Sequence, residues 1–442
     1  MLDIYYGSYL RARPYTIDKP DRETRTIAHT QALWDMLGIA PWDDFPCITV
    51  AGSKGKGSTA TLLASILSAS GEKVGLITSP HLLSFRERIR IDGQSIAPEQ
   101  LDAALDRVEP AVLELASRID PPQYLGPAGI LLALAMPFFR AAGVSVCVVE
   151  AGRGGEFDEA RLVRAQVSVI TPIMLEHTKF LGATREAIAE TKARITYPGS
   201  PLIVAPQDMS VRSTFVRVAA ELRSPIQWVQ DQLTVRHVYD DLAAMVCDIQ
   251  VGDVDLAALE IGLHGYHQIE NAATAITAAQ ALRPLSIAVT EESIRVGLRR
   301  ARVPGRFQQV SQQPLVIVDG AINAESAHQA CSYFRHYPCA RRIAVIAVPS
   351  GKDLDGVCRE VAPLVDTLIV TEVPSVRLTW NADARHIAEC YHTNVHVRIP
   401  AEDAFNYALS LAGANDGILI LGTQTFVANA LHYWQTDASL LC

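Results

Sequence analysis

The sequence has no closely spaced cysteines. Its eight cysteines stand singly along the chain, at Cys47, Cys147, Cys247, Cys331, Cys339, Cys358, Cys390 and Cys442. This spacing excludes a Cys-x-x-Cys zinc knuckle and a thioredoxin-like redox site. Cys47 and Cys147 lie in apolar runs, where a thiol packs as a small core side chain. Because unpaired cysteines are typical of a reducing compartment, we expect a cytoplasmic protein.

Long apolar runs and an excess of basic residues are also missing. The longest apolar segment, residues 129–139, ends at Arg140 and is too short to cross a bilayer. The residues from Met1 to Tyr6 lack a basic stretch followed by an apolar core, so no signal peptide is expected. With 39 Lys and Arg against 48 Asp and Glu, the net charge is −9. We therefore predict partners other than membranes and nucleic acids.

The most informative segment is a glycine-rich loop. It follows an apolar run rich in β-branched residues (45–50), which predicts a strand, and precedes residues 60–67, whose apolar positions recur at helical spacing. Strand, glycine loop and helix together predict a phosphate-binding loop, because backbone N–H groups and the helix N-terminus converge on the anion. The candidate phosphate contacts are Gly52, Ser53, Lys54, Gly55, Lys56, Gly57, Ser58 and Thr59.

The lysine of this loop is displaced from its common position. In the pattern G-x-x-x-x-G-K-[ST] the lysine would stand at position 58, where this chain has Ser58, and the usable lysine is Lys56. We interpret the segment as a nucleotide triphosphate loop of a distinct subtype. An ordinary glycine turn is the alternative.

Polar clusters follow four predicted strands. After the strand at 45–50 comes the glycine loop, after 73–78 comes Ser79, after 144–149 comes Glu150, and after 167–171 comes His177. The order of strands and helices predicts a largely parallel sheet with helices on its faces. Ligands of such sheets bind beyond the carboxyl ends of the strands, where all four clusters would lie. The sequence thus predicts an ATP site at this edge.

Oxygen ligands for Mg²⁺ are available at the same edge. Ser58 or Thr59, Ser79 and Glu150 would suffice, because Mg²⁺ keeps several waters and takes few protein ligands. His177 would ligate a second cation or orient a carboxylate, with a purely structural role as the alternative. Judged by its position alone, Lys192 reads as an ordinary exposed lysine of a helix.

The chain is long enough for more than one core. Its 442 residues are 49% hydrophobic and 20% charged, which predicts a globular α/β protein of two or three domains. We place a P-loop ATP-binding domain at residues 1–302, with a small β insert at about 226–262, and a smaller Rossmann-like domain at 303–442. Arginines near the N-terminus, including Arg25, would contact an anionic substrate or remain solvated.

Several segments recur in the order and spacing of a known family. They are residues 50–59, 78–82 with 87–91, 176–178 with 180–182, 192–193, 267–268 with 271–273, 304–307 and 319–321. From about residue 45 to the C-terminus the chain resembles folylpolyglutamate synthase and dihydrofolate synthase, members of the Mur ligase superfamily of ATP-dependent amide-forming enzymes. The resemblance implies a parallel-sheet P-loop domain followed by a Rossmann-like ligase domain.

The resemblance also implies roles for individual residues. Lys56 would hold the β- and γ-phosphates, while Asn271, Arg306 and Asp319 would contact ATP. The metal ligands would be Ser58, Ser79, Glu150, His177 and Lys192, the last matching a lysine that is carbamylated in many members. ATP would phosphorylate a carboxylate, and an amine would then attack the acyl phosphate and release phosphate. The residues implied to be catalytic are Lys56, Glu150, His177, Lys192 and Arg306.

The segments around the acceptor substrate depart from the family. Glu156 stands where the family usually has arginine, and Ile322 replaces the histidine of an Asp-Gly-Ala-His-Asn motif. In the family that histidine lies near the incoming glutamate and the phosphate. Isoleucine has no hydrogen-bonding group, so it takes over neither contact. The candidate substrate contacts are His81, Arg88, Ile322 and Thr423. The ATP half of the site therefore matches the family, whereas the acceptor half is altered.

The leading interpretation is an ADP-forming carboxylate–amine ligase that uses ATP and Mg²⁺ on small-molecule substrates, as a monomer or weak dimer. Folate or dihydrofolate with L-glutamate is the nearest known pair, and a different carboxylate or amino acid is equally open. The alternatives are a nucleotide-binding homologue without ligase activity and a small-molecule kinase.

Overall fold

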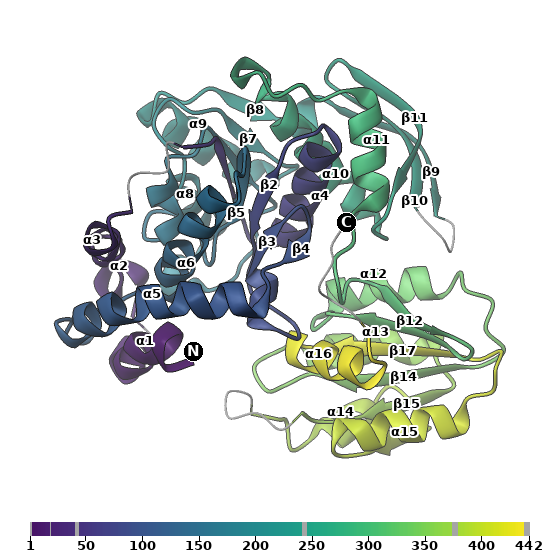
Figure 1. The fold of residues 1–442 in the computed structure, drawn as a ribbon. Helices are drawn as coiled ribbons and strands as arrows, with labels where there is room; N and C mark the ends of the chain where they lie inside the picture. The colour runs from purple at the N-terminus through teal and green to yellow at the C-terminus, as the bar shows by residue number, and fades with distance from the viewer. Residues whose placement is uncertain (1, 18, 40–43, 241–244, 374–378, 437–442) are drawn as a thin grey trace.

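A computed structural model describes residues 2–17, 19–39, 44–240, 245–373 and 379–436 (Figure 1). Its largest element is an eight-stranded sheet in the order β4-β3-β2-β5-β1-β6-β7-β8. The strands are β1 (Cys47–Ala51), β2 (Val74–Ile77), β3 (Ile89–Ile91), β4 (Gln94–Ser95), β5 (Val146–Glu150), β6 (Val167–Ile170), β7 (Leu202–Val204) and β8 (Ile226–Trp228). All neighbours pair in parallel except β2 with β3 and β3 with β4. The predicted, largely parallel α/β sheet is confirmed.

Alternate side chains of the central strands point to opposite faces of the sheet and belong to two separate hydrophobic cores. Ile48 and Val50 of β1 pack against helices α4 (Lys56–Ala69), α10 (Tyr266–Gln280) and α11 (Glu291–Arg300). Cys47 and Ala51 face the other side, where the helices are α3 (Ala28–Leu37), α5 (Pro98–Ser117), α6 (Pro127–Ala141), α8 (Arg185–Ala193) and α9 (Arg212–Glu221). This alternation is that of a parallel sheet covered on both faces.

A small antiparallel sheet covers one end of the α4 side. It contains β9 (Leu233–Asp240), β10 (Met245–Val251) and β11 (Val254–Ile261), and the apolar faces of these strands join the α4 core. Of the β insert expected at about 226–262, residues 226–228 instead form β8 and extend the large sheet by pairing with β7.

A third sheet follows, with the order β12-β13-β17-β14-β15-β16. Its strands are β12 (Gln308–Gln312), β13 (Leu315–Asp319), β14 (Arg342–Ala347), β15 (Thr367–Val370), β16 (Val395–Val397) and β17 (Gly417–Gly422), and only β12 is antiparallel. Helices α12 (Ala324–Phe334), α13 (Leu354–Val361) and α14 (Ala384–Glu389) lie on one face, and α15 (Ala401–Leu411) and α16 (Gln424–Tyr433) on the other. We call this part the C-terminal unit and the preceding part the N-terminal unit; a domain boundary at residues 302 and 303 stays a prediction.

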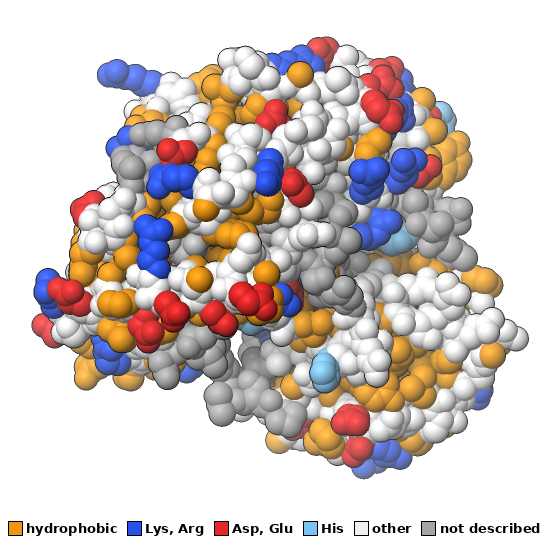
Figure 2. Space-filling view, viewed as in Figure 1, with side chains coloured by type: hydrophobic (Ala, Val, Ile, Leu, Met, Phe, Trp, Pro, Cys, Tyr) orange, Lys and Arg blue, Asp and Glu red, His pale blue; other side chains and the backbone are white. Residues whose placement is uncertain are grey.

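The N-terminus packs beside the large sheet. Helix α1 (Leu2–Thr16) lies against α5 and α6, and the short α2 (Asp21–Thr24) leads to α3 (Figure 1). Helix α5 is amphipathic: Leu101, Leu105 and Val108 are buried, whereas its acidic side chains line the solvent face (Figure 2). No helix of the described part is long and apolar enough to span a bilayer.

The contact of α11 with α4 depends on a glycine. A Cβ at Gly297 would lie 2.5 Å from the Cα of Ile66, so alanine forces the two helices apart. We expect Gly297→Ala to lower the free energy of unfolding of the N-terminal unit by about 1–3 kcal/mol. Gly7→Ala in α1, where a Cβ meets nothing within 4 Å, is the matched control and should raise stability by about 0.5–1 kcal/mol. Equal urea midpoints for Gly297→Ala and wild type would contradict this packing.

Candidate active site

A cleft of about 1190 Å³ collects the polar residues that follow the strands of the large sheet. Its walls come from both units: from the glycine loop, the segment after β2 and the end of β5 on one side, and from residues 303–307, α12 and the start of α16 on the other. The predicted site residues that line it are Ser53, Lys54, Gly55, Lys56, Gly57, Ser58, Ser79, Arg88, Glu150, His177, Asn271, Arg306 and Asp319.

The glycine loop packs too closely for side chains at two positions. Gly52 has φ 139°, and a Cβ there would lie 2.0 Å from Oγ1 of Thr171. Gly55 precedes α4 with φ 83°, and its Cβ would lie 2.6 Å from Oδ1 of Asn271. The same Oδ1 accepts a hydrogen bond of 3.3 Å from the buried Thr59 hydroxyl. Asn271 of α10 therefore fixes the start of α4, whose N-terminus faces the cleft.

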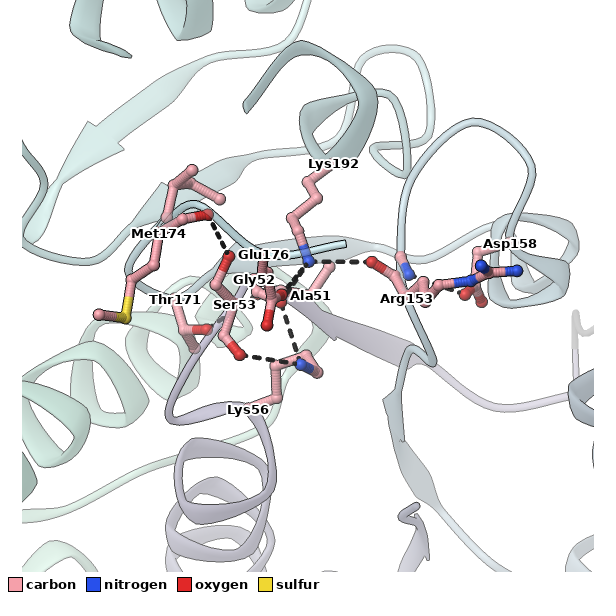
Figure 3. A network of polar contacts seen from close by, with 12 residues as sticks. Ala51, Gly52, Ser53, Lys56, Arg153, Asp158, Thr171, Met174, Glu176 and Lys192 are labelled. Atoms are coloured by element: carbon pink, nitrogen blue, oxygen red, sulfur yellow. Dashed lines mark hydrogen bonds and ion pairs between the residues drawn. The ribbon is translucent and has the colours of Figure 1, made fainter. Parts of the chain in front are cut away.

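Two lysine side chains converge on the carbonyl of Gly52 (Figure 3). Lys56 Nζ donates to the carbonyl oxygens of Gly52 (3.0 Å) and Ser53 (3.3 Å). Lys192 Nζ donates to the carbonyls of Gly52 (2.6 Å) and Arg153 (2.9 Å), and to Oε1 of Glu176 (3.0 Å). Two ammonium groups thus hold the backbone of the glycine loop at Gly52.

Lys192 is fully buried, so the expectation of an exposed helix lysine was wrong. Helix α8 turns its apolar face, with Ile188 and Ala189, toward the core, and Lys192 lies on that face one turn further on. Burial, with the nearby charge of Lys56, lowers the pKa of Lys192 to about 8 despite the opposing carboxylate of Glu176. The amine lies beneath the cleft rather than in its lining.

Glu150 is a buried carboxylate at the end of β5. Its Oε2 accepts a hydrogen bond of 2.8 Å from the backbone N–H of Ser79, which ties the ends of β5 and β2 together. Burial raises the pKa of Glu150, while the charge of Lys56 acts in the opposite direction. A cation bound beside this carboxylate would stabilise its ionised form.

The oxygen donors here suit a hard cation. Within the described ranges, no three His, Cys, Asp or Glu side chains cluster as a complete metal site. Glu150 and the hydroxyl-bearing Ser58 and Ser79 line the cleft together, and His177 lines it from the turn before α7 (Thr178–Leu181). Because Mg²⁺ is usually bound by one or two carboxylates plus phosphate oxygens and water, this set fits Mg²⁺ bound together with a nucleotide.

The C-terminal unit contributes a positively charged side chain, Arg306, opposite the glycine loop. The Arg306 guanidinium packs on the backbone of Gly320, where a Cβ would lie 2.5 Å from Nη1. Asp319 Oδ2 accepts a hydrogen bond from the N–H of Phe307 (2.8 Å). This bond fixes the backbone next to Arg306. Burial, followed by the charge of Arg306, lowers the pKa of Lys54 in the loop. Lys54 and Arg306 therefore face one another across the cleft with like charges.

Arg88 is held by neutral groups. Its Nε donates to Nδ1 of His81 (2.8 Å), and its two terminal nitrogens donate to the hydroxyls of Tyr5 (3.1 Å) and Tyr6 (3.3 Å). Burial and the adjacent guanidinium lower the pKa of His81 to about 4, so this imidazole is neutral at pH 7. His81 thus contacts Arg88 and is not among the residues that line the cleft.

Five other predicted residues lie outside the lining of the cleft, namely Gly52, Thr59, Lys192, Ile322 and Thr423. Ile322 donates its N–H to Oγ of Ser326, and Thr423 accepts from the N–H of Phe426 as the N-cap of α16. The neighbours of these two residues, Asn323 and Gln424, do line the cleft.

Sequence reasoning missed a buried ion-pair network beside the loop that follows β5. Arg25 pairs with Glu159 (2.6 Å) and Asp21 (3.4 Å), and Asp21 also pairs with Arg153 (2.9 Å), whose guanidinium lies 4.3 Å from the ring of Phe180. Arg25 is therefore neither solvated nor free for a substrate. The sequence shows the acidic pair Asp158-Glu159, but Arg153 and Arg161 are much nearer to it in the chain than Arg25 is, so nothing there indicated Arg25 as its partner.

Both units match families of known proteins. Residues 50–279 match the Mur ligase middle domain, and residues 305–424 match the Mur ligase, glutamate ligase domain. The dihydrofolate synthase/folylpolyglutamate synthase of Mycobacterium tuberculosis is 32% identical over 387 residues, covering 82% of this chain and 78% of that protein. The Escherichia coli protein of the same name is 32% identical over 389 residues, covering 87% and 85%.

Solved structures agree with this similarity. The structure of Mycobacterium tuberculosis folylpolyglutamate synthase complexed with ADP and AMPPCP has a TM-score of 0.84 at 27% identity, covering 98% of this chain and 99% of that one. E. coli FolC in complex with DHPP and ADP has a TM-score of 0.79 at 29% identity, covering 93% of each chain.

The lowered pKa of Lys192 predicts how the free energy of unfolding changes with pH. The folded amine loses its proton near pH 8, whereas the unfolded amine keeps it up to its usual pKa of 10.5, so the unfolded state binds more protons between these values. The free energy of unfolding of wild type, minus that of Lys192→Met, should rise with pH in this window by up to about 1.4 kcal/mol per pH unit. The measurement is chemical denaturation in CO₂-free buffers, with Lys73→Met at an exposed position as control. A difference that stays flat from pH 8 to 10 would refute the buried ammonium.

Proposed function

Since the chain belongs to the dihydrofolate synthase/folylpolyglutamate synthase family of Mur ligases and is an ATP-dependent ligase, we propose that its cleft joins a small-molecule carboxylate to an amine through an acyl phosphate. One observation carries the proposal. The glycine loop, the buried Glu150 and the Arg306 of the C-terminal unit face one cleft, so a phosphoryl group there meets groups from both units.

The glycine loop binds the phosphates in this proposal. Lys56 Nζ is held near the loop by two carbonyl oxygens, and a phosphate oxygen is a stronger, charge-assisted partner for it. The backbone N–H groups at the start of α4 and the positive end of that helix add to the same anion site. Asn271 keeps this geometry fixed through Thr59.

The reaction then takes two steps. One oxygen of the substrate carboxylate attacks the γ-phosphorus, and the bond to the ADP oxygen breaks. The amine nitrogen next attacks the carbonyl carbon of the acyl phosphate, loses a proton to solvent, and phosphate leaves. Arg306 and Lys54, on opposite sides of the cleft, stabilise the negative charge on the transferring phosphoryl group.

Mg²⁺ is the cation we propose for this site. Ser58, Ser79, Glu150 and His177 would hold it, and a carbamylated Lys192 would add a carboxylate-like group. When bound, the ion neutralises charge on the phosphate oxygens. Support for nucleotide use comes from relatives whose structures contain ADP, AMPPCP, or AMPPNP with Mn.

The acceptor amine is an amino acid in this proposal, and the names of the relatives make folate-type acids with glutamate the nearest pair. The acceptor segments nevertheless differ at Glu156 and Ile322. Ile322 lies beside the N-cap of α12 and its side chain has no hydrogen-bonding group, and the carboxylate of Glu156 has the opposite charge to the arginine that the family usually has.

Loss of Lys56 tests the reaction. We expect Lys56→Ala to lower the rate of ADP formation by about 10²–10³-fold, because one preorganised cation at the phosphoryl group is lost. Lys19→Ala, at an exposed lysine, is the control. Wild-type ADP release should require acid and amine together, and phosphate release that needs no amine would exclude the ligase mechanism.

Carbamylation of Lys192 is a separate prediction. Its lowered pKa leaves a larger neutral fraction of amine, which is the form that reacts with CO₂. Enzyme equilibrated with ¹³C-bicarbonate should show one carbamate ¹³C resonance that is missing from Lys192→Ala. If short carboxylates rescue that variant, the group acts as a ligand. Full activity of unrescued Lys192→Ala would eliminate the role.

A further inference from the structure

The segment after β2 carries a leucine side chain to the C-terminal unit. Leu82 belongs to the N-terminal unit, yet its side chain packs against the hydrophobic core that includes Val427 of α16. A Cβ placed on Gly305 would lie 2.4 Å from Cγ1 of Val427 and 3.3 Å from Cδ1 of Leu82. Both apolar side chains therefore lie against the backbone of Gly305, and Arg306 is the next residue in the chain.

A buried carboxylate fixes the backbone around Leu82. The N–H groups of residues 82, 83 and 84 donate to the carboxylate of Glu87 over 3.0, 2.9 and 2.6 Å, respectively. At the other end of the same segment, the N–H of Ser79 donates to Glu150 over 2.8 Å. Hydrogen bonds to an ionised acceptor are among the strong ones in proteins. The short path from Glu150 to Leu82 is thus held at both ends.

Aromatic side chains contact the residue on the other side of Arg306. The ring centroid of Phe307 lies 5.8 Å from that of His264 and 5.7 Å from that of Tyr333. His264 belongs to the N-terminal unit, and the hydroxyl of Tyr333 on α12 accepts from the N–H of Tyr266 (2.5 Å). Contacts with the N-terminal unit therefore reach the neighbours of Arg306 on both sides.

The two contacts restrict different movements. The aromatic contact at Phe307 lies close to residues 303–307, where the chain passes from one unit to the other. A body that is fixed only near its point of attachment can still rotate about that point. Leu82 reaches the C-terminal unit from a loop that is distant in the sequence, and so it adds a second point of contact.

We propose that Leu82 is a positioning residue for phosphoryl transfer, and that its packing on Gly305 and Val427 sets where Arg306 lies opposite the glycine loop. The proposal rests on the ligase function above, in which Arg306 stabilises charge on the transferring phosphoryl group. Leu82 contributes no polar group to the reaction. It acts through Arg306, and it relates that guanidinium to the strand end that carries Glu150.

Two neighbouring leucines provide a matched pair of variants. Leu82→Ala and Leu83→Ala both keep the N–H groups that donate to Glu87, but Leu83 is 38% exposed and does not line the cleft. The N–H groups of residues 305, 306 and 307 have acceptors in Gln308, Val303 and Asp319, so their hydrogen exchange reports on local opening.

Hydrogen–deuterium exchange of the full-length protein tests the contact without turnover. We expect residues 303–308 to exchange about threefold or more faster in Leu82→Ala, because the apolar packing on Gly305 is lost, and at the wild-type rate in Leu83→Ala. Exchange in β1, β5 and β6 should stay unchanged in both variants, which shows that the N-terminal unit is folded.

The rate of ADP formation tests the link to Arg306. We expect Leu82→Ala to lower kcat by about 10–100-fold, because a small misplacement of a catalytic group is costly. Leu82→Met, which keeps an apolar side chain of similar volume, should recover most of the rate. In an Arg306→Ala background, Leu82→Ala should change the rate by less than about twofold, since residues that act as a unit have non-additive effects.

Two results would overturn the proposal: wild-type exchange of residues 303–308 in Leu82→Ala, or the same loss of rate from Leu82→Ala with and without Arg306. Failure of the ligase function looks different. In that case wild type releases no ADP with any pairing of acid and amine, while the exchange of residues 303–308 still decides whether Leu82 fixes the backbone at Arg306.

Discussion

The active-site architecture depends on the burial of a charge. Lys192 is removed from solvent beneath the glycine loop, and such a charge is tolerated only when its hydrogen bonds are satisfied. It reaches three segments at once: the loop after β1 through Gly52, the loop after β5 through Arg153, and the segment after β6 through Glu176. Three strand ends of the parallel sheet are therefore connected through one nitrogen atom, and Lys192, which lies outside the glycine loop, helps to fix the backbone of that loop at Gly52.

The cleft combines an excess of positive charge with a division between two units. Lys54 and Lys56 belong to the N-terminal unit and Arg306 to the C-terminal unit, and all three line the same space. Like charges across a cleft repel, and the repulsion is relieved when a polyanion lies between them. In the proposed reaction, a triphosphate bound there would be both a reactant and the counter-ion that makes close approach of the units favourable. Glu150 and Asp319, both carboxylates with raised pKa because of burial, contribute negative charge on the two sides.

Local sequence patterns predicted the parts of the site that lie at strand ends. The runs before Gly52, Ser79 and Glu150 read directly as strands, and the parallel order placed their carboxyl ends at one edge, as the sheet shows. Contacts between distant segments were not accessible in this way. Arg88 and Tyr5 are 83 residues apart, and Arg25 and Glu159 are 134 apart, so no spacing rule joins them. The burial of Lys192 was missed for the same reason, because its neighbours come from loops after three other strands.

Helix α1 reaches the cleft through one arginine. The hydroxyls of Tyr5 and Tyr6 accept from Arg88, which lines the cleft, and their helix packs on α5 and α6 and adds no strand to any sheet. A change in the packing of α1 would therefore move the Arg88 guanidinium, while the glycine loop and Glu150 keep their own contacts. Helix α1 thus sets the position of a cationic group in the cleft without belonging to the sheet whose strand ends carry the glycine loop and Glu150.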